Sequence, residues 1–151
     1  MKNTFFLFLA AILLAGSAQA QKKKPVAVKQ VQVPENVTTS FKSQYAVAND
    51  NSWNKNYSGN YVATFTNADN LKQTVEFSGS GAMIKSKIAI APQTLAENLS
   101  SAISTQYPGS KVTEVDKMQL PGVAQYYRVK ILSAENITKE LLVSEEGTIT
   151  E

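Results

Sequence analysis

Apolar residues recur at the spacing of a helix in two stretches of the sequence. After Pro34, a residue favoured in the first turn of a helix, apolar side chains follow at four-residue intervals at Val37, Phe41 and Tyr45. After Pro92 the same kind of face is formed by Leu95, Leu99, Ala102 and Ile103. The interval between the Gln–Tyr pairs that end the two stretches is longer than the interval between the two prolines. We therefore expect the second helix to be about one turn longer than the first.

Downstream of each helical stretch the period changes to two, the alternation of a half-buried strand. The segments YVATF at 61–65 and YRVKI at 127–131 can be aligned without gaps and alternate in the same sense. Turn-forming residues separate each of them from other strand-like runs. These runs are SWNKNY, LKQTVEF and AMIKSKIAI in the first half of the chain, and SKVTEVDKMQL, ITKELLV and TIT in the second.

Two glycines, Gly81 and Gly147, lie in closely similar segments. QTVEFSGSGAMI, which begins at Gln73, and KELLVSEEGTIT, which begins at Lys139, align at the same offset as YVATF and YRVKI. Because glycine adopts positive φ without a steric penalty, we expect both residues to close equivalent hairpins. A phosphate-binding glycine loop would instead be followed by a helix, and here a strand-like run follows.

The pattern predicts an α+β protein of two tandem repeats. Each repeat is a helix followed by a four-stranded antiparallel meander, arranged in two layers. We place the first repeat at residues 31–90 and the second at residues 91–151. Because no flexible linker lies between them, we expect the repeats to pack as one body.

The N-terminal part of the sequence predicts export. Lys2, an apolar run too short to span a bilayer and the small-residue site AQA at 18–20 are features of a cleaved signal peptide over residues 1–20. Residues 21–30 follow as a flexible basic leader. From residue 30 onward, 10 Lys and Arg residues are outnumbered by 12 Asp and Glu residues. The pI near 9.0 therefore comes from the N-terminal segment and does not indicate nucleic-acid binding, and we expect no membrane-spanning segment in the mature chain.

The residue types exclude most catalytic chemistry. The sequence contains no histidine and no cysteine, so His-based triads, cysteine nucleophiles, His-rich zinc sites and thiol redox reactions are not available. Alternation places Ser86 on the face opposite Lys85 and Lys87, so no Ser–Lys pair forms. Glu145 and Glu146 lie at a hairpin tip in water, where no neighbouring group would separate the pKa values of the two carboxyl groups. We predict a non-enzymatic protein with no cofactor and no metal site.

Alternation also predicts which side chains point away from the helices. If Tyr61, Ala63 and Phe65 face the core, then Val62 and Thr64 face outward. The same parity in the second repeat buries Tyr127, Val129 and Ile131. It exposes Tyr126, Arg128 and Lys130, and neighbouring strands add Thr74, Glu76, Lys85, Lys87, Glu140 and Leu142.

This outward face has two interpretations. An antiparallel sheet can keep one face in water without any binding function. A mixture of aromatic and cationic side chains is also typical of surfaces on which protein partners dock. Two further aromatic residues, Trp53 and Tyr57, fit either the core or the surface. The candidate binding residues are Trp53, Tyr57, Thr64, Glu76, Lys85, Lys87, Tyr126, Arg128 and Lys130.

The pattern resembles the PepSY-like family of bacterial periplasmic proteins. The resemblance is carried by a Pro-led helix, Trp53, the Y-x-A-x-F strand at 61–65, the V-x-F-x-x-x-G hairpin at 75–81 and a second helix ending in YPG at 107–109. It implies a fold like that of the β-lactamase inhibitor protein. It also implies a non-catalytic protein that is secreted or periplasmic, in a Gram-negative bacterium, and binds or inhibits something. The second repeat has no counterpart of Trp53 at the expected place.

Two functions from different classes follow from these observations. The first is an exported binding protein, a protein or protease inhibitor being one form of it, that uses the open sheet faces to hold another protein or peptide. The second is a structural or stabilising role in the cell envelope, with the basic leader in contact with acidic polymers. The oligomeric state is left open, because unpaired edge strands could extend the sheet across a dimer.

Overall fold

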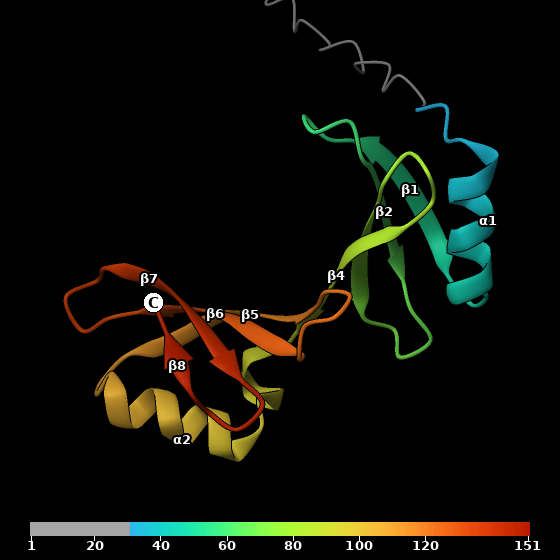
Figure 1. Ribbon diagram of the computed structural model, residues 1–151. Coiled ribbons are helices and arrows are strands. Elements are labelled where there is room, and N and C mark those ends of the chain that lie inside the picture. The colour runs from blue at the N-terminus through green and yellow to red at the C-terminus, as the bar shows by residue number, and fades with distance from the viewer. Residues whose placement is uncertain (1–30) are drawn as a thin grey trace, which may run out of the picture.

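Eight antiparallel strands form one open sheet in which the strand order follows the sequence (Figure 1). The computed structural model describes residues 31–151, so the predicted signal peptide and basic leader lie outside the described residues. With two α-helices beside the sheet, this part of the chain has the α+β class that the sequence predicts. The strands are β1 Asn49–Lys55, β2 Tyr61–Thr66, β3 Lys72–Phe77, β4 Met83–Ile90, β5 Lys111–Gln119, β6 Tyr126–Leu132, β7 Thr138–Ser144 and β8 Ile149–Thr150.

The two predicted meanders are joined into a single sheet by the pairing of β4 with β5. Five residue pairs make this joint, from Ser86 opposite Gln119 to Ile90 opposite Val115. The segment between these strands, which contains the second α-helix, therefore connects two adjacent antiparallel strands in the interior of the sheet. Sequence alternation predicts each strand, but not this pairing.

The two α-helices have the same length, and the prediction of a longer second helix is wrong. α1 spans Glu35–Gln44 and α2 spans Glu97–Gln106, ten residues each. The extra residues after Pro92 form a separate 3-10 helix, η1, over Pro92–Thr94. Leu95 then takes an extended conformation, with φ −62° and ψ 134°, and its side chain is buried in the core. Burial of this leucine favours a break in the helix over an added turn.

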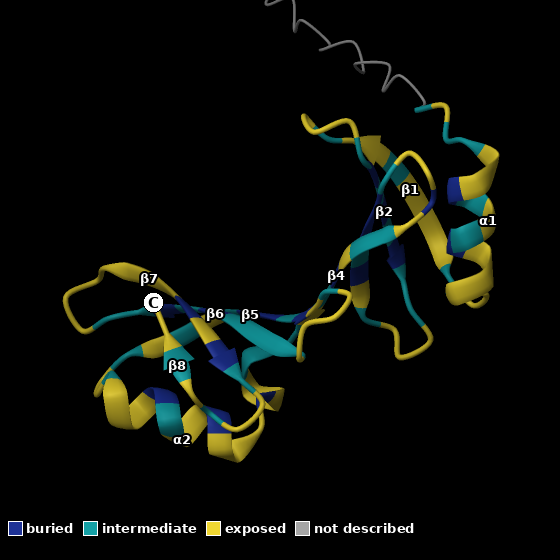
Figure 2. Ribbon diagram, viewed as in Figure 1, coloured by how far each residue is buried: buried dark blue, intermediate teal, exposed yellow. Residues whose placement is uncertain are grey.

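Each helix buries one apolar stripe against its own part of the sheet (Figure 2). Val37 and Phe41 of α1 pack on β2 and β3, and Leu99 and Ile103 of α2 pack on the strands from β5 to β7. The two hydrophobic clusters have no residue in common. Burial of each large apolar side chain contributes about 1.5–3 kcal/mol, so each helix is held mainly by its own cluster. Neither helix of residues 31–151 has the length and apolar character needed to cross a membrane.

Both helices cover the same face of the sheet. Alternate residues of β4 share one face: Ser86 lies opposite Val75 of the first cluster, and Ile90 lies opposite Val115 of the second. The helices lie at opposite ends of the sheet, α1 beside β1 and β2 and α2 beside the C-terminal strands (Figure 1). The other face, which we call the open face, is covered by neither helix.

The two predicted glycine hairpins are confirmed, and each is tied to a helix. Gly81 has φ +85° between β3 and β4, and Gly147 has φ +91° between β7 and β8. The side-chain amide of Asn36 donates a hydrogen bond to the carbonyl oxygen of Gly79 at 3.0 Å. In the same way, Asn98 donates to the carbonyl oxygen of Glu145 at 2.9 Å. The second residue of each helix therefore holds the last hairpin of its half.

The two hairpins differ in how closely the helix approaches the glycine, which predicts unequal effects of alanine. A Cβ at Gly81 would lie 2.8 Å from the carbonyl oxygen of Asn36, whereas one at Gly147 would meet its nearest atom at 3.4 Å. Gly147→Ala should lower the free energy of unfolding by about 1 kcal/mol through its positive φ alone. Gly81→Ala should lower it by about 3 kcal/mol, because the overlap with backbone is added. Urea unfolding of both variants measures the difference; equal losses would contradict the close packing at Gly81.

Candidate functional site: the open face of the sheet

Seven of the nine predicted binding residues lie together on the open face. One row of paired residues crosses the sheet from Thr64 through Thr74, Lys87 and Met118 to Tyr126. Glu76 and Lys85 are paired in the row on one side, and Arg128 and Lys130 follow on β6 on the other. The structure thus places side chains from both halves of the chain on one continuous surface. Whether these residues bind a partner stays a prediction.

The other two residues lie elsewhere. Trp53 is paired with Ala63 and packs on the helix side, where its ring centroid lies 5.2 Å from that of Phe41 in an edge-to-face contact. The expectation that it could join the open face is therefore corrected. Tyr57 lies in the loop between β1 and β2, outside any strand, and its side chain is fully exposed.

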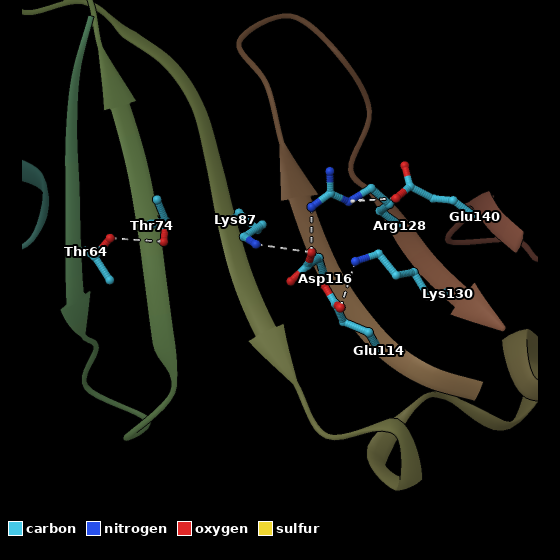
Figure 3. Close-up of polar contacts among 8 residues, drawn as sticks. All are labelled: Thr64, Thr74, Lys87, Glu114, Asp116, Arg128, Lys130 and Glu140. Carbon is cyan, nitrogen blue, oxygen red and sulfur yellow. Dashed lines mark hydrogen bonds and ion pairs between the residues drawn. The ribbon is translucent and has the colours of Figure 1, made fainter. Parts of the chain in front are cut away.

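A buried carboxylate that the sequence interpretation missed organises the centre of the open face. Asp116 of β5 has only 2% of its side chain exposed. Its Oδ2 atom accepts a hydrogen bond from Nη2 of Arg128 at 2.8 Å and lies 3.3 Å from Nζ of Lys87 (Figure 3). Because Lys87 is on β4 and Arg128 is on β6, one carboxylate connects three strands. The signal was the alternation of Glu114, Asp116 and Met118 around the buried Val115, which places all three on the open face.

The cations around this carboxylate have further acidic partners. The hydrogen bond to Asp116 raises the pKa of Arg128, and the nearby charges of Asp116 and Glu140 add to the effect. Nε of Arg128 is buried, has no hydrogen-bond partner and lies 4.0 Å from Oε2 of Glu140. Lys130 donates to Glu114 at 2.8 Å, and this hydrogen bond raises the pKa of Lys130 (Figure 3). The arginine is therefore charged and held in one place.

Glu76 forms a second fixed point on the open face. Its side chain is 9% exposed and accepts hydrogen bonds from Nδ2 of Asn60 at 2.7 Å and of Asn56 at 2.8 Å. Nζ of Lys85 lies 3.1 Å from its other oxygen. Burial raises the pKa of Glu76, but the hydrogen bonds from Asn60, Lys85 and Asn56 together outweigh burial and lower it. The carboxylate thereby anchors the β1–β2 loop, which carries Tyr57, to the sheet.

The open face is hollowed between these two fixed points. A hollow of about 320 Å³, which we call the central hollow, is lined by Asn56, Val62, Thr74, Glu76, Lys85, Lys87, Met118 and Arg128. A second hollow of about 260 Å³ is lined by Tyr126, Leu142, Val143, Ser144, Thr148 and Thr150. Together they give the open face depressions in which a partner's side chains could be placed.

The lysines of the central hollow have no serine beside them for catalysis. Ser86 lies on the helix side of β4, where its hydroxyl oxygen accepts a hydrogen bond from Gln73 at 2.9 Å. This confirms the predicted separation of Ser86 from Lys85 and Lys87. Within residues 31–151, acidic residues do not gather into a group of three that could hold a metal ion. The arrangement offers fixed charges and shape rather than a nucleophile.

Loss of the Asp116 charge should destabilise the protein more than loss of a neighbouring surface charge. Asp116→Asn leaves two cations without their shared carboxylate, and we expect a loss of about 1–3 kcal/mol in the free energy of unfolding. Glu140→Gln removes a carboxylate that also faces Arg128 but is half exposed, and should change stability by less than about 0.5 kcal/mol. Urea unfolding at neutral pH compares the two. Similar losses would show that Asp116 does not organise the site.

The lowered pKa of Glu76 predicts a pH-dependent contribution to stability. Because the folded pKa lies below the unfolded value of about 4.3, ionised Glu76 stabilises the fold above that pH. The contribution is lost as the pH falls through the folded pKa. The difference in unfolding free energy between the wild type and Glu76→Gln should therefore be largest above about pH 5 and shrink toward pH 3. Urea titrations across this range measure it, and a difference that grows on acidification would refute the assignment.

The open face and its fold can be compared with known proteins. A solved DUF2874 family protein from Bacteroides ovatus has a TM-score of 0.72 at 21% identity, with 80% of this chain and 86% of that chain covered. A BLIP-like protein from Bacteroides fragilis has a TM-score of 0.72 at 17% identity, over 80% and 85%. A structure described as "putative periplasmic proteins" from Bacteroides eggerthii has a TM-score of 0.71 at 15% identity, over 80% and 88%. At these identities the likeness shows a shared fold.

The sequence itself identifies the family. No curated protein matches the chain. The family model described as "Putative beta-lactamase-inhibitor-like, PepSY-like" matches residues 59–151, from just before β2 to the last residue. This is more than half of the chain and includes every strand of the central hollow. The chain therefore belongs to the PepSY-like, β-lactamase-inhibitor-like family, as the resemblance in its sequence predicted.

Proposed function

We propose that this protein is an exported, non-catalytic binding protein that holds another protein or peptide on the open face of its sheet. The observation that carries the proposal is the arrangement of that face: both helices lie on one side, and the other side presents two hollows with fixed charges between them. Surfaces that are already ordered lose little side-chain entropy on binding. Inhibition of the bound partner, for example a protease, is one outcome of such binding.

The residues of the open face suit a protein partner. Tyr126 and Leu142 line the second hollow and supply apolar contact, and Arg128 supplies a fixed guanidinium. Tyrosine and arginine are enriched among residues that contribute most to protein interfaces. The candidate set for this role is Thr64, Glu76, Lys85, Lys87, Tyr126, Arg128 and Lys130, with Tyr57 at the end of the anchored loop.

The comparisons support the same class of function. One structural neighbour is named BLIP-like, and the matched family is described as β-lactamase-inhibitor-like. Another neighbour is described as periplasmic, which agrees with the signal peptide predicted at residues 1–20 and with a periplasmic or secreted location. The lack of histidine and cysteine in the whole sequence is also consistent with binding rather than catalysis, and the proposal needs no cofactor.

The proposal includes a division of the chain into two related units, residues 31–90 and 91–151. Each unit has a helix, four strands and a glycine hairpin, with an asparagine of the helix bound to the hairpin carbonyl. These matching details support descent from one repeated unit. Their side-by-side pairing makes the open face twice as wide as either unit alone could offer.

A matched pair of substitutions tests the proposed surface. Thr64→Arg places a long side chain in the middle row of the open face, and Thr105→Arg adds the same side chain on an exposed position of α2. Partners captured from a bacterial periplasmic extract by the mature protein should be lost with Thr64→Arg and retained with Thr105→Arg. We expect at least a tenfold weaker affinity for Thr64→Arg with the purified partner, because a long side chain there prevents close packing.

The same capture experiment separates the proposal from a role of the basic leader in the cell envelope. A protein lacking residues 21–30 should keep the partner if the open face binds it. Loss of the partner on deletion of the leader, with Thr64→Arg harmless, would move the function to the leader and its contacts with acidic polymers. Circular dichroism and urea unfolding of each variant show that the fold is intact.

A further inference from the structure

The side chains that line the central hollow include more cations than carboxylates. Three cations line it, Lys85, Lys87 and Arg128, together with one carboxylate, Glu76. Two further carboxylates contact these cations without lining the hollow: Asp116 is buried beneath Lys87 and Arg128, and Glu140 lies 4.0 Å from Nε of Arg128. Among the side chains that line the hollow itself, three cations therefore face one carboxylate. A negatively charged group that enters the hollow meets mostly cations.

The cations are held in place while much of their donor capacity stays unused. Lys85 and Lys87 each have one acidic partner, although an ammonium group has three donors. The side chains of Lys85, Lys87 and Arg128 remain 52%, 35% and 31% exposed, respectively. Because Glu76 and Asp116 fix the positions of the cations, little ordering is needed when an acceptor enters.

The rest of the lining fits a short side chain that ends in a carboxylate. Val62 and Met118 provide apolar contact, and Thr74 is held by its hydrogen bond to Thr64 (Figure 3). The volume of about 320 Å³ is at the low end for ligand pockets, so it suits one or two side chains rather than a large molecule. A multiply charged anion is disfavoured, because the Glu76 carboxylate belongs to the same wall.

We infer that the central hollow receives an aspartate or glutamate side chain from a loop of the partner protein. The carboxylate lies among Lys85, Lys87 and Arg128, and the stem of the side chain packs on Val62 and Met118. The inference rests on the proposed function of the open face and names the chemistry of the partner. Glu76 and Asp116 serve as positioning residues, because they hold the cations that meet the ligand.

A library of disulfide-closed loop peptides displayed on phage provides a defined probe. Peptides selected on the full mature protein should carry aspartate or glutamate, and replacement of that residue by its amide should weaken binding about tenfold or more. Lys85→Gln and Lys87→Gln should each weaken the acidic peptide about tenfold, and binding should fall as NaCl is raised. Lys42→Gln, which removes the same charge from an exposed position on α1, should change the affinity less than twofold.

Different results separate failure of this inference from failure of the proposed function. Peptides that are lost with Thr64→Arg but tolerate the acid-to-amide change, or Lys87→Gln, would overturn the inference and leave the open face as a binding surface. Selected peptides that are indifferent to Thr64→Arg would count against both. Displacement of the acidic peptide by inorganic phosphate at millimolar concentration would also overturn the inference, because it would make the hollow a site for small anions.

Discussion

The pairing of β4 with β5 is the contact on which the rest of the structure depends. The two hydrophobic clusters share no residue, and the one side chain of the first half that packs on the second cluster is Ile90, at the end of β4. The backbone ladder from Ser86–Gln119 to Ile90–Val115 makes one sheet of the two halves and puts both helices on the same side. Asp116 strengthens this joint on the open face, because its partners Lys87 and Arg128 lie on the strands to either side. The surface proposed to bind a partner therefore exists only while this pairing is intact.

Charged residues at the centre of the open face are a costly way to stabilise a sheet. Burial of Asp116 and Glu76 removes water from two carboxylates, and the gain from their cations roughly offsets this cost. Apolar side chains would have served stability as well, but they would have left an exposed hydrophobic patch with little specificity. What the ion pairs add is position: each cation is held at a fixed place on the open face. If the open face binds a partner as we propose, the charge network serves recognition more than folding.

The sequence predicted those features that depend on neighbours along the chain. Strand alternation and the turns at Gly81 and Gly147 are local, and the structure confirms them. The predicted length of the second helix was wrong, because the helix begins only after Leu95. The side chain of Leu95 is buried against strands that lie far from it in the sequence. Trp53 could not be placed because β1 is an edge strand with a shifted register between Asn49 and Ser52, and its residues show little alternation. These two features depend on contacts made after the chain has folded.

The candidate site shows the same division. Seven open-face residues followed from parity alone, because a strand alternates its sides whatever its partner is. Prediction of Asp116 as an open-face residue would have required the same alternation to be applied to β5. Its contact with Lys87, at 3.3 Å, depends on the pairing of β4 with β5 and could not be predicted from alternation. The sequence of neither half of the chain indicates that the two sets of strands pair to form one continuous open face.

The separation of the two faces also bears on how members of this fold can differ. The helix face carries the hydrophobic clusters that hold each half together, and many apolar combinations can fill such a cluster. The open face is free of that requirement, so its exposed charges, unlike the buried Asp116, can change at little cost in stability. Structural neighbours at 15–21% identity keep a TM-score near 0.7, so the fold tolerates extensive change of sequence. We therefore expect specificity for a partner to be set by the open-face side chains, here Lys85, Lys87 and Arg128, and not by the architecture that all these proteins share.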